Sequence, residues 1–173
     1  YWWDRVGILV VLIALVGFMA VAAPNFGSVD NLLNIARSIS INAILAAGMT
    51  FVILTAGIDL SVGSILAVSG VASVMVAMAG VPAPFAILIG ILAGAAAGLI
   101  NGVLTAYLAL AAFIVTLGTM TFLRGLAFTM TDGQPIVDND LNFKELGNGY
   151  ILGIPIPVYV MLAVYIIAWF VLE

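Results

Sequence analysis

The sequence contains no cysteine and no histidine, and only 7% of its 173 residues are charged. Without thiols or imidazoles the chain can form no disulfide, thiolate nucleophile, imidazole base or soft-metal site. The eight carboxylates are scattered along the chain, and the net charge of −4 offers no basic surface for nucleic acid. We therefore predict no enzymatic chemistry, no metal, no cofactor and no nucleic-acid partner.

Apolar side chains dominate the composition instead. Hydrophobic residues make up 65% of the sequence, whereas a soluble domain has roughly half apolar and about a quarter charged residues. A water-soluble fold of this length could not bury so much apolar side chain, so we expect membrane lipid to cover it. The predicted fold class is all-α, a polytopic transmembrane helical bundle.

Six apolar segments are long enough to be membrane spans, since a helix needs about 20 residues to cross about 30 Å of hydrocarbon. We expect the first to be a retained span and not a signal peptide, because Tyr1, Trp2 and Trp3 precede it as an aromatic anchor and no clear cleavage site follows. A short amphipathic piece at 31–37 precedes the second. The predicted spans are 6–23, 38–56, 60–80, 84–107, 112–131 and 157–173.

Orientation rests on few charges. Arg5 before the first span favours a cytoplasmic N-terminus, which places the acidic connection 131–157 outside and Glu173 at the cytoplasmic face. Arg37 would then lie on the outer side. Because the last span stays apolar up to Leu172, we expect residues 1–173 to form a single transmembrane domain that is incomplete at its C-terminus.

The segment from Thr55 to Ser64 interrupts what would otherwise be one apolar run. One interpretation is a tight turn in which Asp59 or Ser61 caps the third span. Another is a broken helix that lines a pathway, because irregular backbone at membrane depth needs protein or water to satisfy it. The two are compatible.

Arg124 lies about twelve residues into the fifth span, where a charge is costly unless it is buried or paired. We favour a position inside the bundle over snorkelling to the surface, and Asp59 is the candidate partner within the membrane zone. The fourth span carries glycines at four-residue spacing, which predicts close helix packing, with Asn101 beside them as a hydrogen-bonding group. These packing residues are Gly90, Gly94, Gly98 and Gly102.

Polar uncharged side chains also occur at several positions in the second and fifth spans. Threonine in a membrane helix commonly bonds its own backbone, so most of them are expected to be structural, although a route for a polar solute would use the same hydroxyls. They are Asn42, Thr50 and Thr55 in the second span and Thr116, Thr119, Thr121 and Thr129 in the fifth.

Three stretches of the sequence closely resemble the ribose-type permeases of ABC sugar importers. They are Gly48–Ile53 leading into Gly57–Ser64, then Phe113–Met120, and then Arg124-Gly125 with Thr131–Ile136. The resemblance covers the chain from Asn31 onward and implies the N-terminal half of a permease in the bacterial inner membrane. The candidate pathway residues are then Asn42, Thr50, Asp59, Ser61, Ser64, Thr116, Thr119 and Arg124.

The resemblance also implies partners: a second permease subunit in a dimer, a periplasmic sugar-binding protein, membrane lipid, and a cytoplasmic ATP-binding cassette subunit that hydrolyses ATP. Two features depart from the family. Leu108–Ala112 stands where Lys and Pro are common, and the coupling segment expected after the sixth span is absent. One alternative is a gradient-driven channel or secondary transporter, in which Asp59 could serve as the intramembrane acid of a proton relay. The other is a truncated membrane protein that does not transport.

Overall fold

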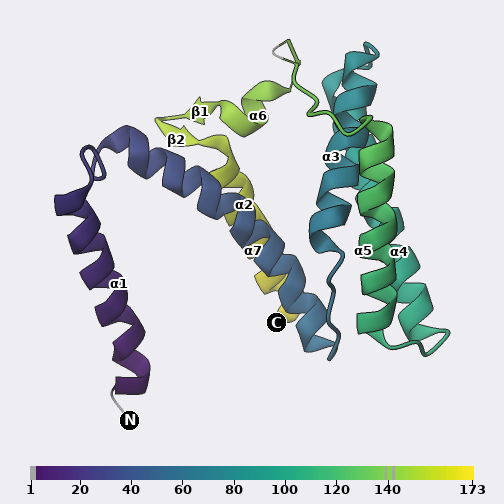
Figure 1. Cartoon of the computed structure of the whole chain (residues 1–173), viewed down its shortest axis with the longest axis horizontal. Coiled ribbons are helices and arrows are strands. Elements are labelled where there is room, and N and C mark those ends of the chain that lie inside the picture. The colour runs from purple at the N-terminus through teal and green to yellow at the C-terminus, as the bar shows by residue number, and fades with distance from the viewer. Residues whose placement is uncertain (1–2, 139, 142) are drawn as a thin grey trace.

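The computed structural model describes residues 3–138, 140–141 and 143–173 (Figure 1). The predicted all-α architecture is confirmed, with one small antiparallel hairpin that pairs Tyr150 with Pro155 and Ile151 with Ile154. The described elements are α1 (Trp3–Ala22), α2 (Val29–Leu54), α3 (Val62–Met78), α4 (Ala83–Ala106), α5 (Ala112–Met130), α6 (Lys144–Asn148), β1 (Tyr150–Ile151), β2 (Ile154–Pro155) and α7 (Ile156–Leu172).

Six apolar helices stand where the six spans are predicted. By length and composition α2, α4 and α5 can each cross a membrane, which supports a multi-pass membrane protein. Helices α3 and α7 have 17 residues each, about 26 Å at 1.5 Å per residue, at the lower limit for a span. Six crossings therefore remain a prediction. The predicted anchor of Tyr1, Trp2 and the Trp3 side chain, and the side chain of Arg5, lie outside the described residues.

The amphipathic piece predicted at 31–37 is not a separate element, and this expectation is wrong. Ser28 caps the helix at its start, where its hydroxyl oxygen accepts the Asn31 N–H at 3.3 Å. The Asn31 side chain in turn donates to the Phe26 carbonyl at 2.7 Å. Because these bonds satisfy the first turn, α2 begins at Val29 and runs without a break to Leu54.

The helices form two groups. Figure 1 shows α3, α4 and α5 side by side, α2 paired with α7, and α1 standing apart, and the contacts between elements agree with this grouping. The connection from α5 to α7 crosses the end of the molecule opposite the N-terminus. The acidic connection and the two ends of the chain therefore lie on opposite sides, whereas the side that faces the cytoplasm stays a prediction.

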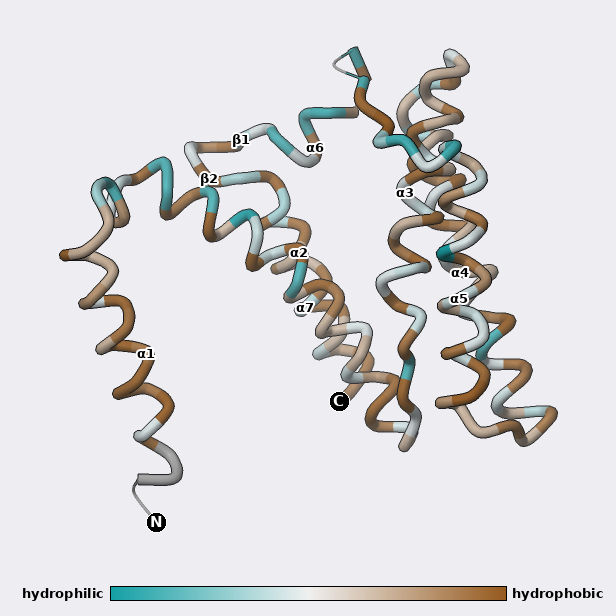
Figure 2. Tube along the Cα trace, viewed as in Figure 1, coloured by the Kyte–Doolittle hydropathy of each residue, from teal (hydrophilic) through white to brown (hydrophobic). Residues whose placement is uncertain are grey.

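The interior is small and partly polar, whereas the exterior is apolar. The buried apolar side chains are Ala47, Ala86, Ala97, Val115 and Leu123, and the buried polar ones are Ser40, Ser61, Ser64, Ser73, Asn101 and Thr116. Large apolar side chains such as Ile8, Phe18 and Phe122 are exposed, and Figure 2 shows hydrophobic residues along every long helix. This distribution suits a chain surrounded by lipid, where helices associate through small residues and hydrogen bonds.

The four glycines at four-residue spacing in α4 form a glycine ladder, of which the first half only packs against α3. The ladder consists of Gly90, Gly94, Gly98 and Gly102. A Cβ on Gly90 would lie 2.9 Å from the Ser69 carbonyl oxygen, and one on Gly94 would lie 2.9 Å from the Ser69 hydroxyl, so α3 approaches closely here. At Gly98 and Gly102 a Cβ would meet nothing within 4 Å, so the packing prediction is wrong for these two within the described chain. Four residues cover about 400° of helix, so each step turns the ladder by about 40° away from α3.

Candidate functional site

The chain leaves helical geometry between α2 and α3, as the sequence predicts. Thr55 ends α2, Ala56 has a positive φ of 59°, and α3 starts at Val62. The Asp59 carboxylate accepts the Ser61 N–H at 2.7 Å and the Ser61 hydroxyl at 2.6 Å. Asp59 therefore holds the residue at the N-cap position and does not bond the first turn of α3 itself.

Ser61 occupies the N-cap position but does not cap with its side chain. Its backbone carbonyl accepts the Ile65 N–H at 2.8 Å, while its hydroxyl points into a chain of side-chain hydrogen bonds. The prediction that Asp59 or Ser61 caps α3 by a side-chain bond is therefore wrong. The Ser61 hydroxyl donates to Asp59 and accepts from Asn101, so its oxygen is directed to Asn101 and accepts no N–H of the first turn of α3.

The non-helical residues 55–61 between α2 and α3 form a break in the helical chain. A continuous series of side-chain hydrogen bonds joins this break to α4 and α5. The Thr119 hydroxyl donates to the Asn101 carboxamide oxygen at 2.6 Å, and the Asn101 carboxamide nitrogen donates to the Ser61 hydroxyl at 2.9 Å. Ser61 is fully buried and Asn101 is 7% exposed. Each member donates in the direction of Asp59, so the aligned dipoles stabilise the carboxylate at the end of the chain.

Thr116 joins the same region through the backbone. Its hydroxyl lies 3.2 Å from the Ile58 carbonyl and 2.8 Å from the carbonyl of Ala112, one turn earlier in α5. The single hydroxyl proton can serve either acceptor, so Thr116 places a donor beside the non-helical backbone. Irregular backbone at membrane depth needs such partners. Ser64, also a candidate residue, is buried in the first turn of α3.

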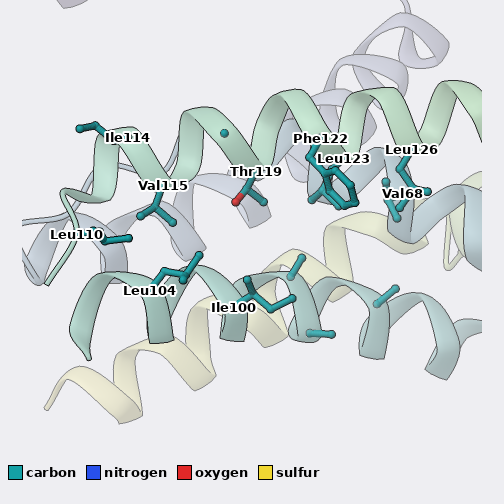
Figure 3. A pocket seen from close by; sticks show the side chains of 14 residues that line it. Val68, Ile100, Leu104, Leu110, Ile114, Val115, Thr119, Phe122, Leu123 and Leu126 are labelled. Atoms are coloured by element: carbon teal, nitrogen blue, oxygen red, sulfur yellow. The ribbon is translucent and has the colours of Figure 1, made fainter. Parts of the chain in front are cut away.

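An apolar cavity of about 580 Å³ lies between α4 and α5, with a wall from α3. Figure 3 shows Thr119 pointing from α5 toward α4 among apolar neighbours that include Ile100, Val115 and Leu123. Thr119 is the polar side chain on this lining, and its hydroxyl already donates a hydrogen bond to the Asn101 carboxamide oxygen. The cavity is therefore suited to apolar groups, and Thr119 is the member of the hydrogen-bonded chain that lines it.

The structure does not bring the other candidate residues to this cluster. Asn42 and Thr50 are exposed on α2, and the Thr50 hydroxyl donates to the Ala46 carbonyl of its own helix at 2.9 Å. Arg124 is exposed on α5, in a shallow hollow that Thr121, Phe128 and Thr129 also line. Of the eight candidates, Asp59, Ser61, Ser64, Thr116 and Thr119 lie around the break.

Arg124 and Asp59 are not paired. Thr116 is level with the break, and Arg124 follows it by eight residues on α5, which is about 12 Å along the helix axis. The buried face of α5 carries Val115, Thr116 and Leu123, and Arg124 is turned about 100° from Leu123. Within the described chain Arg124 is therefore exposed on α5, and its position inside the complete bundle stays a prediction.

Asn101 is the member of the hydrogen-bonded chain that the candidate pathway residues did not include. It was expected only to bond across helices beside the glycine ladder, yet it connects Ser61 of the break with Thr119 of α5. A carboxamide carries its acceptor and its donor on separate atoms, so Asn101 can accept from the Thr119 hydroxyl and donate to the Ser61 hydroxyl at the same time. The sequence signal was present, because Asn101 is the single carboxamide in α4.

Comparisons with known proteins agree with this membrane architecture. The profile of the branched-chain amino acid transport system / permease component family matches residues 31–173. The chain is 46% identical to the ribose import permease protein RbsC of Haemophilus influenzae, over 95% of this chain and 52% of that protein. It is 41% identical to RbsC of Escherichia coli K12, over 95% of this chain and 53% of the relative.

A third relative, RbsC of Bacillus subtilis, is 44% identical over 98% of this chain and 53% of its own length. The chain thus spans about half the length of the curated relatives it matches. No solved structure matches it. Since the family profile covers residues 31–173, from the start of α2 through α7, the chain belongs to the branched-chain amino acid transport system / permease component family.

Proposed function

We propose that the chain is the N-terminal half of the membrane-spanning permease of an ATP-driven ABC importer, which carries a monosaccharide across the bacterial inner membrane. Ribose is the proposed sugar, because three relatives of 41–46% identity are named ribose import permeases. The structural observation that carries the proposal is the buried chain of hydrogen bonds at the break between α2 and α3, which is a costly feature in an otherwise apolar bundle.

The proposed assembly divides the work among subunits. ATP hydrolysis belongs to a separate ATP-binding cassette subunit, so this chain is not itself an enzyme. The sequence supports this, because it has no glycine-rich phosphate loop ending in Lys-Ser or Lys-Thr. A periplasmic binding protein delivers the sugar, and a second permease subunit completes a dimer within the lipid. The 173 residues form a single transmembrane permease domain that the second half of the protein completes.

The candidate pathway residues take two roles in this proposal. Asp59, Ser61, Ser64, Thr116 and Thr119 hold the wall of the pathway, since their polar groups are engaged or buried. Asn42, Thr50 and Arg124 are exposed and contact the passing sugar. An arginine at membrane depth is costly against lipid, and its five N–H donors suit the hydroxyl oxygens of a sugar.

The test is uptake of labelled ribose into proteoliposomes that contain the matching binding protein and the ATPase. The 173-residue chain is compared with a version extended to the full length of its relatives. ATP-dependent uptake by the extended version supports the proposal, and an Arg124→Gln variant should lower its maximal rate. Uptake that collapses with an uncoupler while ATP stays high would establish a gradient-driven transporter instead. Absence of uptake for ribose and other monosaccharides, with sugar-dependent docking of the binding protein also absent, would refute the permease role.

A further inference from the structure

The connection from α5 to α7 has two chemically different halves. Residues 131–145 carry all of its charged side chains, which are Asp132, Asp138, Asp140, Lys144 and Glu145. Residues 146–155, which include the hairpin, carry none, and neither does α7. Figure 2 shows hydrophilic residues recurring from the end of α5 through α6, and more hydrophobic ones in the hairpin. The charged half suits water, and the uncharged half needs another environment.

The tip of the hairpin exposes an apolar side chain on a strained backbone. Leu152 and Gly153 form the two-residue turn between β1 and β2, with φ of 51° and 79°. Turns with positive φ at both positions favour Asn, Asp or Gly at the first, because a branched side chain crowds the backbone there. Leu152 is nevertheless 94% exposed, and Ile151 beside it is 50% exposed. A leucine that is strained and unburied within the chain indicates contact with something outside it.

The hairpin is held in place from both sides. The Arg37 guanidinium of α2 donates to the Asn148 carbonyl at 3.1 Å and lies 5.0 Å from the centre of the Tyr150 ring. Tyr159, in the first turn of α7, donates its hydroxyl to the Ile151 carbonyl at 3.0 Å. The position of Leu152 is therefore fixed by α2 and α7 together.

The surroundings of the hairpin identify the membrane as the partner. Residue Pro155 ends β2 and Ile156 begins α7, so the hairpin continues directly into an apolar helix whose large side chains, such as Leu162 and Ile167, are exposed. Figure 1 shows the hairpin lying across the ends of α2 and α7, directed away from α3, α4 and α5. Tyrosine and arginine at this level are typical of the boundary between hydrocarbon and water.

We propose that the hairpin 150–155 is an interfacial anchor whose tip, Leu152, inserts into the headgroup and upper acyl region of the outer leaflet. The anchor fixes the outer end of α7, and through Arg37 it fixes the start of α2 at the same depth. A soluble partner would meet an uncharged apolar tip with no polar group to recognise beyond the backbone. A lipid surface accepts such a tip without any matching partner group.

The test uses a nitroxide label at Leu152→Cys, since these 173 residues contain no other cysteine. The protein is reconstituted in phosphatidylcholine nanodiscs, and collision rates of the label with oxygen and with a water-soluble nickel chelate are measured. Ile13→Cys, at a 69% exposed site in α1, is the lipid reference, and Val137→Cys, at a 76% exposed site in the charged half of the connection, is the water reference.

The expected result is a ratio of oxygen to nickel collisions at Leu152 that is well above the Val137 ratio and shifts toward the Ile13 ratio. An Ile154→Cys label, on the other strand, should show a shift of the same sign. A Leu152 ratio equal to that of Val137 would overturn the proposal. So would a label that is open to nickel in nanodiscs and becomes shielded only when the binding protein is added, because the tip would then be a docking site for that protein.

Discussion

The carboxamide of Asn101 donates a 2.9 Å hydrogen bond to the hydroxyl of Ser61, forty residues earlier in the chain. This bond ties α4 to the residue before α3, and Thr119 extends the link to α5. The three helices that lie side by side therefore share one polar connection at the level of the break. The bond gives the bundle a fixed register, because apolar packing of small residues alone is non-directional.

Replacement of Asn101 by leucine should destabilise the protein. Asn101→Leu keeps the approximate volume but removes both the acceptor for Thr119 and the donor for Ser61. The expected loss is about 1–3 kcal/mol of unfolding free energy. Titration with denaturing detergent in mixed micelles, followed by helical circular dichroism, measures it. Asn42→Leu, on an exposed site of α2, is the matched control and should change stability by about 0.5 kcal/mol or less. Equal losses would contradict the role of Asn101.

The glycine ladder predicts opposite effects for alanine at two of its positions. Gly90→Ala would push a Cβ against the Ser69 carbonyl oxygen at 2.9 Å, and backbone cannot rotate away. We expect a loss of about 1–3 kcal/mol. Gly98→Ala meets nothing within 4 Å, so it should be neutral or gain up to about 1 kcal/mol from better helix propensity. The same detergent titration compares the two variants. Similar losses at both positions would mean that the far half of the ladder is also packed.

Asp59 and Arg124 should behave independently. Arg124 follows the level of the break by eight residues on α5, and the Asp59 carboxylate is already bonded to Ser61. In a double-mutant cycle of Asp59→Asn and Arg124→Gln, the effects on unfolding free energy should add within about 0.5 kcal/mol. The pair Asp59→Asn and Asn101→Leu is the positive control, since both act on one hydrogen-bonded chain. A coupling of about 1 kcal/mol or more between Asp59 and Arg124 would restore the ion-pair hypothesis.

The sequence was sufficient to predict the helical fold and the place of the break. Apolar runs fix where helices form, and Asp59 with its flanking glycine and serine residues fixes where one ends. The N-terminal end of α2 was predicted too late in the sequence, because Ser28 and Asn31 stabilise the first turn by side-chain hydrogen bonds that a hydropathy pattern does not reveal. The small hairpin at 150–155 was also missed, because Leu152 occupies a turn position where Asn or Gly is the usual signal.

The candidate site was predicted in part. Residues at or near the break were found because polar groups stand out in an apolar run, and five of the eight lie together. The geometry between helices could not be predicted, because it depends on which faces meet. Four-residue spacing suggested one glycine face from Gly90 to Gly102, whereas the turn of about 40° per step carries the later glycines away from α3. The same uncertainty in facing direction is why the exposure of Arg124 on α5 was not predicted.

Removal of the Arg37 contact should loosen the hairpin. Arg37→Gln would deprive the Asn148 carbonyl of its donor and the Tyr150 ring of its cation. For an exposed contact we expect a loss of about 1 kcal/mol, which corresponds to roughly fivefold faster amide exchange. Hydrogen–deuterium exchange of residues 149–156 measures this, because the Gly149 and Ile156 amides hold the hairpin's neighbouring backbone bonds.

Two arginine controls separate the local contact from a general loss of charge. Arg124→Gln removes an arginine from α5, away from the hairpin, and should leave exchange in residues 149–156 unchanged. Arg37→Lys keeps a cation near Tyr150 but loses the planar fork, so an intermediate rate is expected. If Arg37→Gln left the exchange rates unchanged, α7 alone would hold the hairpin, through Tyr159. The depth of Leu152 in the membrane would then be set by one helix and would no longer couple α2 to α7.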